Sequence, residues 1–386
     1  MKNIYLDNAA AAPVAPEVQK EMARAMKLTG NPSSFNDAGR VAAEELKKAR
    51  LTVARFLGAH PEEIIFTSSG SEANNMAIMC PAFIVPKMRD EIITTPIEHP
   101  SVLEPAKFLW HEGKKVVYVK VDRNGMVDVD DLVSKISSKT LLVSVMYANN
   151  EIGTIEPIIK IGQMLKNRKG KDGLPLFHVD ACQAAGYLNM KVNTLGADLL
   201  SFNGSKIYGP RGVGVLYVRK GTKLTPYILG GGQERGLRAG TENLPAIMGL
   251  AKAISLIKKE EGERTSALRD YFIEKIKMTL PQARVNGALG NERLPNNVNI
   301  SIPDVDSENL LLELDKYGIS AGSGSACTAR SVEPSHVLKA IGVEKKYLAG
   351  ALRFSLGRET KKSDLDYVVR ILSKIVPELK KRYGRD

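Results

Sequence analysis

The chain has 386 residues, of which 43% are hydrophobic and 25% charged, an ordinary globular composition that allows two domains. No apolar run reaches the ~18 residues of a membrane span, and the first residues lack an apolar signal core, so we expect a cytoplasmic protein with no membrane anchor. Three scattered cysteines exclude a disulfide framework, and none pairs at metal-ligand spacing, so we expect free thiols and no metal site. The net charge of +12 is spread along the chain apart from a KKRYGR tail, which favours solubility or docking of an acidic partner over nucleic-acid binding.

The opening YLDNAAAAPVAPEV predicts an extended segment, followed by helices over 17–28 and 41–57 on either side of a turn-rich loop. A buried strand at 63–67 then leads into a helix whose first turn carries Ser69, Gly70, Ser71 and Glu72. Free N–H groups at such a turn bind phosphate well. The alternative is that Ser71 is only an N-cap residue.

Strands and helices alternate in the next part of the chain, which is typical of an α/β fold with a mostly parallel sheet covered on both faces. The predicted strands are 91–96, 115–121, 140–148, 174–179 and 197–202, and the predicted helices are 101–110, 129–136 and 157–166. Polar residues at the strand ends should gather in one crevice at the carboxyl edge of the sheet. They include His99, Asn150, Asp180 and Gln183.

Lys206 follows the strand at 197–202 and lies in a glycine-rich turn, NGSKIYGPRGVG. An amine held among tight backbone turns could form a Schiff base, and Asp180 could keep a pyridinium nitrogen protonated. The alternative is a surface lysine in a loop and an aspartate at a strand end.

His99 is one of only five histidines, and after a strand its imidazole could stack on a cofactor ring and transfer protons, although a single histidine is more often structural. Asn150 and Gln183 could donate hydrogen bonds to a ring oxygen or a carboxylate, or could only satisfy turn backbone.

A loop at 229–243, LGGGQERGLRAGTEN, contains Thr241 and leads into a helix that ends near 259. A second helix, at 264–280, indicates the boundary of another domain, with a strand at 295–303, a helix at 307–314 and a short strand at 319. Cys327 follows in a loop rich in Gly, Ala and Ser. It is either a buried structural thiol or a nucleophile on a mobile loop. A strand with Arg353 and a helix over 362–383 end the chain.

Taken together, these motifs resemble the pyridoxal-phosphate-dependent cysteine desulfurases of the NifS/IscS type, within the class V aminotransferases of PLP fold type I. The motifs run in order from YLDNAA through GNPSS, FTSSGSEANN, IEHPSV, NNEIGT, HVDACQ, SFNGSKIYGPRGVG, GGGQERGLRAGT and SGSACT to LRFSLGR. The resemblance implies a large domain at 14–260 with a mostly parallel seven-stranded sheet, and a smaller α+β domain from 1–13 and 261–386. It also implies that L-cysteine yields L-alanine and an enzyme-bound persulfide.

The same resemblance assigns roles residue by residue. It makes Lys206 the Schiff-base lysine, Asp180 the pyridinium partner, His99 the ring-stacking acid or base, and Cys327 the persulfide cysteine. It assigns the remaining cofactor contacts to Gly70, Ser71, Asn150, Gln183, Asn203, Ser205 and, from the partner subunit of a homodimer, Thr241. Arg353 would bind the substrate carboxylate with Asn31 nearby, and the sulfur acceptor would be an iron–sulfur scaffold protein or a tRNA-thiolation enzyme.

Three residues depart from the family pattern: Asn203 and Ser205 stand for the usual Ser and His, and Ser71 for Thr. All three still donate hydrogen bonds, so we expect phosphate binding to persist in altered detail. A selenocysteine lyase or another class V aminotransferase would share the cofactor residues. A sulfur carrier or a nucleic-acid-binding protein is the non-enzymatic alternative.

Overall fold

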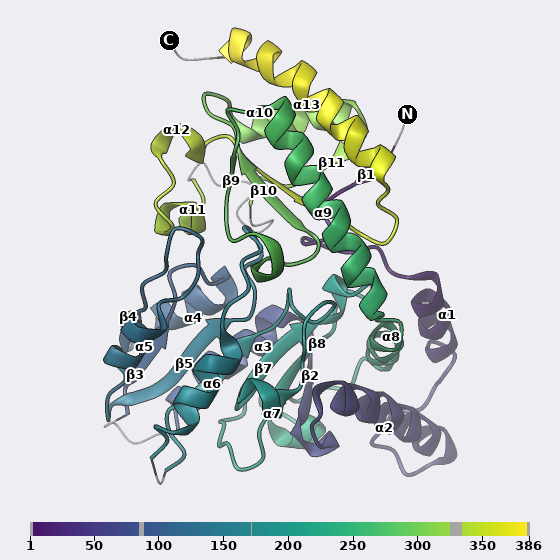
Figure 1. Cartoon of the computed structure of the whole chain (residues 1–386). Coiled ribbons are helices and arrows are strands. Elements are labelled where there is room, and N and C mark those ends of the chain that lie inside the picture. Colours follow the sequence, from purple (N-terminus) through teal and green to yellow (C-terminus); the bar gives the residue numbers. More distant parts are fainter. Residues whose placement is uncertain (1–2, 85–88, 171, 325–333, 384–386) are drawn as a thin grey trace.

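A computed structural model describes residues 3–84, 89–170, 172–324 and 334–383 of the chain. Figure 1 shows a large sheet enclosed by helices and, above it, a smaller sheet beside two long helices. Within the described ranges, every helix falls short of the length and apolar character that a membrane span would need. The division into domains at 14–260 and at 1–13 with 261–386 stays a prediction.

The large sheet has seven strands. They are β2 (Ile64–Thr67), β3 (Glu91–Thr94), β4 (Lys115–Tyr118), β5 (Thr140–Met146), β6 (Leu176–Asp180), β7 (Leu199–Asn203) and β8 (Gly214–Val218). Their spatial order is β2-β8-β7-β6-β5-β3-β4, and β3 to β7 pair in parallel. This confirms the predicted mostly parallel seven-stranded α/β sheet. The exception is β8, which pairs antiparallel with both β7 and β2 because the loop at 204–213 is too short for a crossover helix.

Buried residues alternate between the two faces of this sheet, as the pleat requires. On β5, Leu142 packs with α3 (Gly70–Ala82) and α4 (Pro100–His111) on one face, and Val143 joins the core on the other. The remaining helices of this part are α1 (Pro16–Ala25), α2 (Asp37–Leu57), α5 (Val129–Lys135), α6 (Ile158–Lys166), α7 (Val192–Leu195) and α8 (Leu244–Ser255). Helices on both faces leave only the strand ends open, which is where a site can form.

Capping residues define the starts of α2 and α3. Helix α2 begins at Asp37, before the predicted 41, because Asn36 accepts a 2.8 Å hydrogen bond from the N–H of Gly39. The N-cap of α3 is Ser69, whose Oγ accepts from the N–H of Glu72 at 3.1 Å. The alternative that Ser71 caps this helix is therefore wrong, and Ser71 lies inside the first turn.

The upper part of the molecule has its own apolar core. Its strands are β1 (Ile4–Tyr5), β9 (Arg284–Val285), β10 (Asn297–Ser301), β11 (Ile319–Ser320) and β12 (Ala351–Ser355), and its helices are α9 (Lys259–Thr279), α10 (Ser307–Lys316), α11 (His336–Ala340), α12 (Lys345–Leu348) and α13 (Lys362–Tyr383). Strands β9, β10 and β12 form an antiparallel sheet, and β1 pairs in parallel with β11. Short 3-10 turns lie at Pro61–Glu63, Gly204–Lys206, Gln233–Gly236 and Gly290–Glu292.

The N-terminal segment connects the two parts. After β1, which belongs to the upper part, the chain runs down to the large sheet (Figure 1). There the N–H of Ala12 donates to the carbonyl of Ser205 at 2.8 Å, and that of Ala15 donates to the carbonyl of Tyr208 at 3.0 Å. The segment from Asp7 to Ala15 thus packs along the loop that carries Lys206.

Candidate active site

A cavity of ≈230 Å³ lies at the carboxyl ends of the parallel strands. Most of the residues singled out in the sequence line it: Gly70, Ser71, His99, Asn150, Asp180, Gln183, Asn203, Ser205, Lys206 and Arg353. These residues come from segments spread over most of the chain, and only the fold brings them together.

Two of the expected residues lie elsewhere in the structure. Asn31 and Thr241 are exposed and do not line this cavity. Their neighbours Pro32, Ser33 and Glu242 line a second cavity instead. Cys327 lies outside the described residues. The roles given to these three residues stay predictions.

Asp180 is the last residue of β6, and its carboxylate points into the cavity with both oxygens engaged. Oδ2 accepts from Asn74 Nδ2 at 2.7 Å, and Oδ1 accepts from the N–H of Cys182 at 2.9 Å. Hydrogen bonds to both oxygens hold the carboxylate in one orientation. A carboxylate that pairs with a ring nitrogen needs such a fixed orientation.

His99 is the N-cap residue of α4 and lines the cavity. Its Nδ1 accepts from the N–H of Ser101 at 3.1 Å and lies 2.8 Å from the Oγ of the same serine. Burial lowers the pKa of His99, and the positive charges of Lys206, His336 and Arg353 act in the same direction against the opposing effect of Asp180.

Lys206 ends the 3-10 turn at Gly204–Lys206. The turn is compact: the N–H groups of Ile207 and Gly209 both donate to the carbonyl of Gly204, at 3.1 and 2.9 Å. A side chain on Gly204 would place Cβ only 2.7 Å from the carbonyl oxygen of Pro210, so this position requires glycine. The Nζ of Lys206 donates to the carbonyl of Ala10 in the N-terminal segment.

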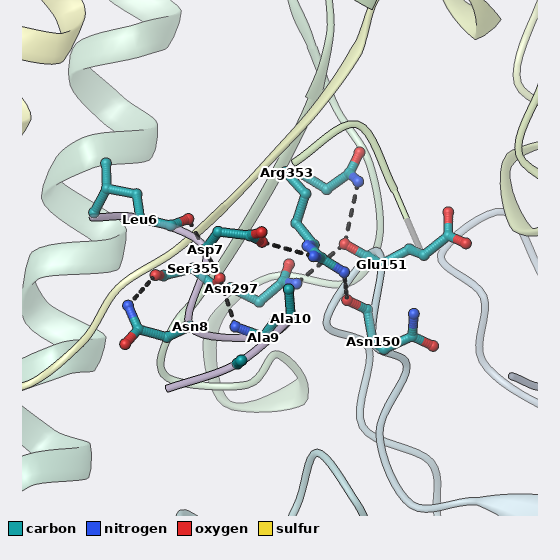
Figure 2. Close-up of polar contacts among 12 residues, drawn as sticks. Leu6, Asp7, Asn8, Ala9, Ala10, Asn150, Glu151, Asn297, Arg353 and Ser355 are labelled. Carbon is teal, nitrogen blue, oxygen red and sulfur yellow. Dashed lines mark hydrogen bonds and ion pairs between the residues drawn. The ribbon is translucent and has the colours of Figure 1, made fainter. Parts of the chain in front are cut away.

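Arg353 reaches the cavity from β12 with a side chain that is almost completely buried. Nη1 donates to the carbonyl of Asn150 at 3.1 Å, and Nη2 donates to Oδ1 of Asp7 at 2.8 Å (Figure 2). Its Nε has no hydrogen-bond partner among the described residues. A buried cation with donor capacity left over suits the binding of a carboxylate.

The first turn of α3 and the segment 203–205 both line the cavity. A Cβ on Gly70 would lie 2.6 Å from Sγ of Cys182 and 2.8 Å from Nδ2 of Asn203, so any larger residue would displace these groups. Ser205 donates to Oδ1 of Asn203 at 3.0 Å. Backbone N–H groups at a helix start, with hydroxyl and amide groups nearby, form a suitable phosphate site.

Neither of the two described cysteines has the character of a reactive thiol. Burial raises the pKa of Cys80 to about 11. Burial and the charge of Asp180 raise the pKa of Cys182 well above its usual value. Both thiols are therefore protonated at neutral pH, which agrees with packing roles. Within the described ranges, no cluster of His, Cys, Asp and Glu could hold a metal ion.

Sequence reasoning missed several residues of the site. Asn74 and Ser101 lie between Asp180 and His99, and Asp7, Ala9 and Ala10 contact Arg353, Gln183 and Lys206. Asn74 lies on α3 and Asp7 follows β1, so no local pattern marks either of them. Ser101 carried a weak signal, because it closely follows His99 at a helix start.

This set of groups fits pyridoxal phosphate. The cofactor needs an amine for its aldehyde, a carboxylate for its ring nitrogen and N–H donors for its phosphate, and the cavity offers all three. Gly70 lines the cavity at the start of α3, where backbone N–H groups can bind a phosphate.

Comparisons with known proteins agree. A family model described as Aminotransferase class-V matches residues 4–368. The chain is 45% identical to "Cysteine desulfurase IscS" of Dictyoglomus turgidum over 98% of this chain and 96% of the relative. Among solved structures, a "NIFS-like protein" superposes with a TM-score of 0.91 at 36% identity, covering 98% of this chain and 100% of that one. "SspA in complex with cysteine" has a TM-score of 0.81 at 34% identity, covering 92% and 99%.

The chain therefore belongs to the aminotransferase class-V family and, within it, to the cysteine desulfurases of the NifS/IscS type. The enzymes of this family depend on pyridoxal phosphate, which confirms the expected cofactor.

Proposed function

We propose that the protein removes the sulfur atom from L-cysteine, releases L-alanine and keeps the sulfur as a persulfide for transfer. The observation that carries this proposal is the gathering of Lys206, Asp180, His99 and Arg353 around one cavity. The similar protein SspA, whose solved structure is a complex with cysteine, supports the choice of substrate.

Pyridoxal phosphate, when bound, supplies an electron sink for the negative charge that develops on the substrate Cα. The amine of Lys206 would take up the Cα proton, and the carboxylate of Asp180 would keep a proton on the cofactor's ring nitrogen. Arg353 would bind the substrate carboxylate and so fix which bond of Cα faces Lys206.

Sulfur transfer is assigned to Cys327, which lies outside the described residues, by its place in the SGSACT motif. Its thiolate would attack the substrate sulfur and form an S–S bond while the C–S bond of cysteine breaks. The electron pair of that C–S bond stays with carbon, which takes up a proton and leaves as alanine. No outside oxidant or reductant is needed, because cysteine and thiol give alanine and persulfide.

The finer features of this function are proposals as well. The protein would act as a cytoplasmic homodimer in which Thr241 reaches the partner's phosphate site and Asn31 lies near the substrate. The exposure of both residues in a single chain is compatible with that arrangement.

The acceptor would be an iron–sulfur scaffold protein or a tRNA-thiolation enzyme. A selenocysteine lyase would share the cofactor residues, and comparison of kcat/KM for cysteine and selenocysteine separates the two.

The test is to incubate purified protein with L-cysteine and measure alanine, sulfide and sulfur bound to Cys327. We expect alanine and Cys327-bound sulfur to form in equal amounts in the first turnover. The C327A variant should keep the yellow cofactor but form neither product, and C80A, which alters a protonated buried thiol, serves as its control. Normal alanine release by C327A would contradict the sulfur role of Cys327.

A second test asks whether the amine of Lys206 binds the cofactor covalently. K206A should lose the borohydride-reducible bond to the cofactor, and K220A, which changes an exposed lysine, should keep it. A reducible bond that persists in K206A would show that Lys206 is not the residue that binds the cofactor covalently.

A further inference from the structure

A continuous chain of hydrogen-bonding groups connects the carboxylate of Asp180 to the imidazole of His99. Nδ2 of Asn74, a residue that is 1% exposed, lies 2.7 Å from Oδ2 of Asp180 and 2.8 Å from Oγ of Ser101. The same Oγ lies 2.8 Å from Nδ1 of His99. The link thus runs from β6 through α3 to the start of α4.

The direction of each hydrogen bond in this chain follows from the chemistry of the groups. A carboxylate only accepts, so the amide nitrogen of Asn74 must face Asp180. The second hydrogen on that nitrogen then points at Ser101, whose Oγ accepts it. The hydroxyl still has its own proton and one more lone pair, so it donates to Nδ1 of His99 if that nitrogen carries no proton.

The backbone gives a second, independent constraint on His99. The N–H of Ser101 points at Nδ1 with a separation of 3.1 Å, and a backbone N–H can only donate. Nδ1 must therefore carry a lone pair rather than a proton. In a neutral imidazole, the single ring proton then lies on Nε2.

The surroundings of His99 favour the neutral ring. His99 is the N-cap residue of the 12-residue helix α4, and the positive end of the helix dipole disfavours a nearby imidazolium. Lys206, His336 and Arg353 also face it with positive charge, against the opposing charge of Asp180. Burial acts against the charged form as well.

We propose that Asn74 and Ser101 are positioning residues that hold His99 as a neutral imidazole with its proton on Nε2. In that form His99 can donate a hydrogen bond through Nε2, and it is not the base that takes the substrate's Cα proton. The lone pair that a base would need is on Nδ1, where Ser101 engages it, so Lys206 is left as the base. This inference deepens the proposed function and rests on it for the identity of the reaction.

The protonation state of His99 can be read directly by NMR. The holoenzyme would be labelled with 15N-histidine, and long-range 1H–15N spectra would be recorded between about pH 6 and 8. The chain has five histidines, so the spectrum of H99Q identifies the signals of His99. We expect a protonated Nε2 and an unprotonated Nδ1 throughout. A proton on Nδ1, or a doubly protonated ring near pH 7, would overturn the proposal.

Two variants test the role of Ser101 itself. S101A removes the hydroxyl donor that stabilises the neutral ring, so the pKa of His99 should rise by about half to one unit. S101T keeps a hydroxyl and should keep the original pKa. If S101A leaves the pKa unchanged, Ser101 is not a positioning residue. These readouts concern the ring nitrogens and do not depend on alanine release, so failure of the proposed function would be seen separately.

Discussion

Asp7 and Arg353 form an ion pair of 2.8 Å that joins the N-terminal segment to strand β12 at the rim of the cavity (Figure 2). The side chain of Arg353 is only 2% exposed and that of Asp7 is 21% exposed. The aspartate therefore keeps a buried guanidinium oriented, with Nη1 on the carbonyl of Asn150.

Replacing Asp7 should weaken the binding of substrate more than it slows turnover. We expect D7A to raise KM for L-cysteine about tenfold, because a buried cation that loses its partner relaxes from its position. D7N keeps one acceptor oxygen and should have a smaller effect. The measurement is steady-state alanine formation, with D37A, at an exposed surface ion pair, as control. An unchanged KM in D7A would show that Asp7 does not orient Arg353.

A methyl group at position 70 should impair cofactor binding. In G70A the new Cβ meets Sγ of Cys182 and Nδ2 of Asn203 at less than 3 Å, so either these side chains or the start of α3 must shift, and both line the cavity. We expect the Kd for pyridoxal phosphate, measured by absorbance titration of the cofactor-free protein, to rise at least about tenfold. The control is G262A, whose Cβ meets only the ring of Tyr187 at 3.9 Å. Equal affinities of the two variants would contradict the tight fit at Gly70.

Glu234 should matter for stability, because its nearly buried carboxylate holds several groups together. It pairs with Arg50 at 2.6 Å and accepts from the N–H of Phe66 at 2.9 Å. Breaking a buried pair leaves an uncompensated charge, so E234Q should lower the free energy of unfolding by about 3 kcal/mol. Urea unfolding at fixed protein concentration measures the change.

The matched control for that measurement is E263Q. Glu263 is 68% exposed and lies 3.7 Å from Lys259, so its loss should change the free energy of unfolding by less than about 0.5 kcal/mol. If E234Q and E263Q lowered the free energy of unfolding by similar amounts, burial would not strengthen the ion pair between Glu234 and Arg50.

The buried carboxyl of Glu98 should make stability depend on pH. Burial raises its pKa from 4.5 to about 8. Between those values the unfolded chain releases this proton while the folded protein keeps it, so the free energy of unfolding falls as the pH rises through this window. E98Q removes the ionisable group and should become more stable relative to the wild type as pH rises. Urea unfolding at a series of pH values tests this, and parallel curves for the two proteins would contradict it.

The sequence predicted the sheet well, because long alternating apolar runs and helix signals are local properties. It did not indicate the direction of β8, which depends on the short loop after Lys206 rather than on the residues of the strand. The start of α2 was misplaced because its capping residue, Asn36, lies before the first apolar position.

For the site, strand-end residues such as Asp180 and His99 were found because parallel strands deliver them to one edge. Residues that act on those groups from other elements could not be found this way. Asn74 meets Asp180 across 106 positions of sequence, and Asp7 meets Arg353 across 346, so both pairs become visible only in three dimensions.

The path of the first fifteen residues bears on how the protein is handled in the laboratory. Asp7, Ala9 and Ala10 contact Arg353, Gln183 and Lys206, so the beginning of the chain forms one wall of the catalytic chamber. Proteolytic cleavage beyond Ala10 would yield a shortened polypeptide that lacks this wall. Translation initiation at the internal Met22 would have the same result. The intact mass of each preparation should be measured before a loss of activity is attributed to loss of the cofactor.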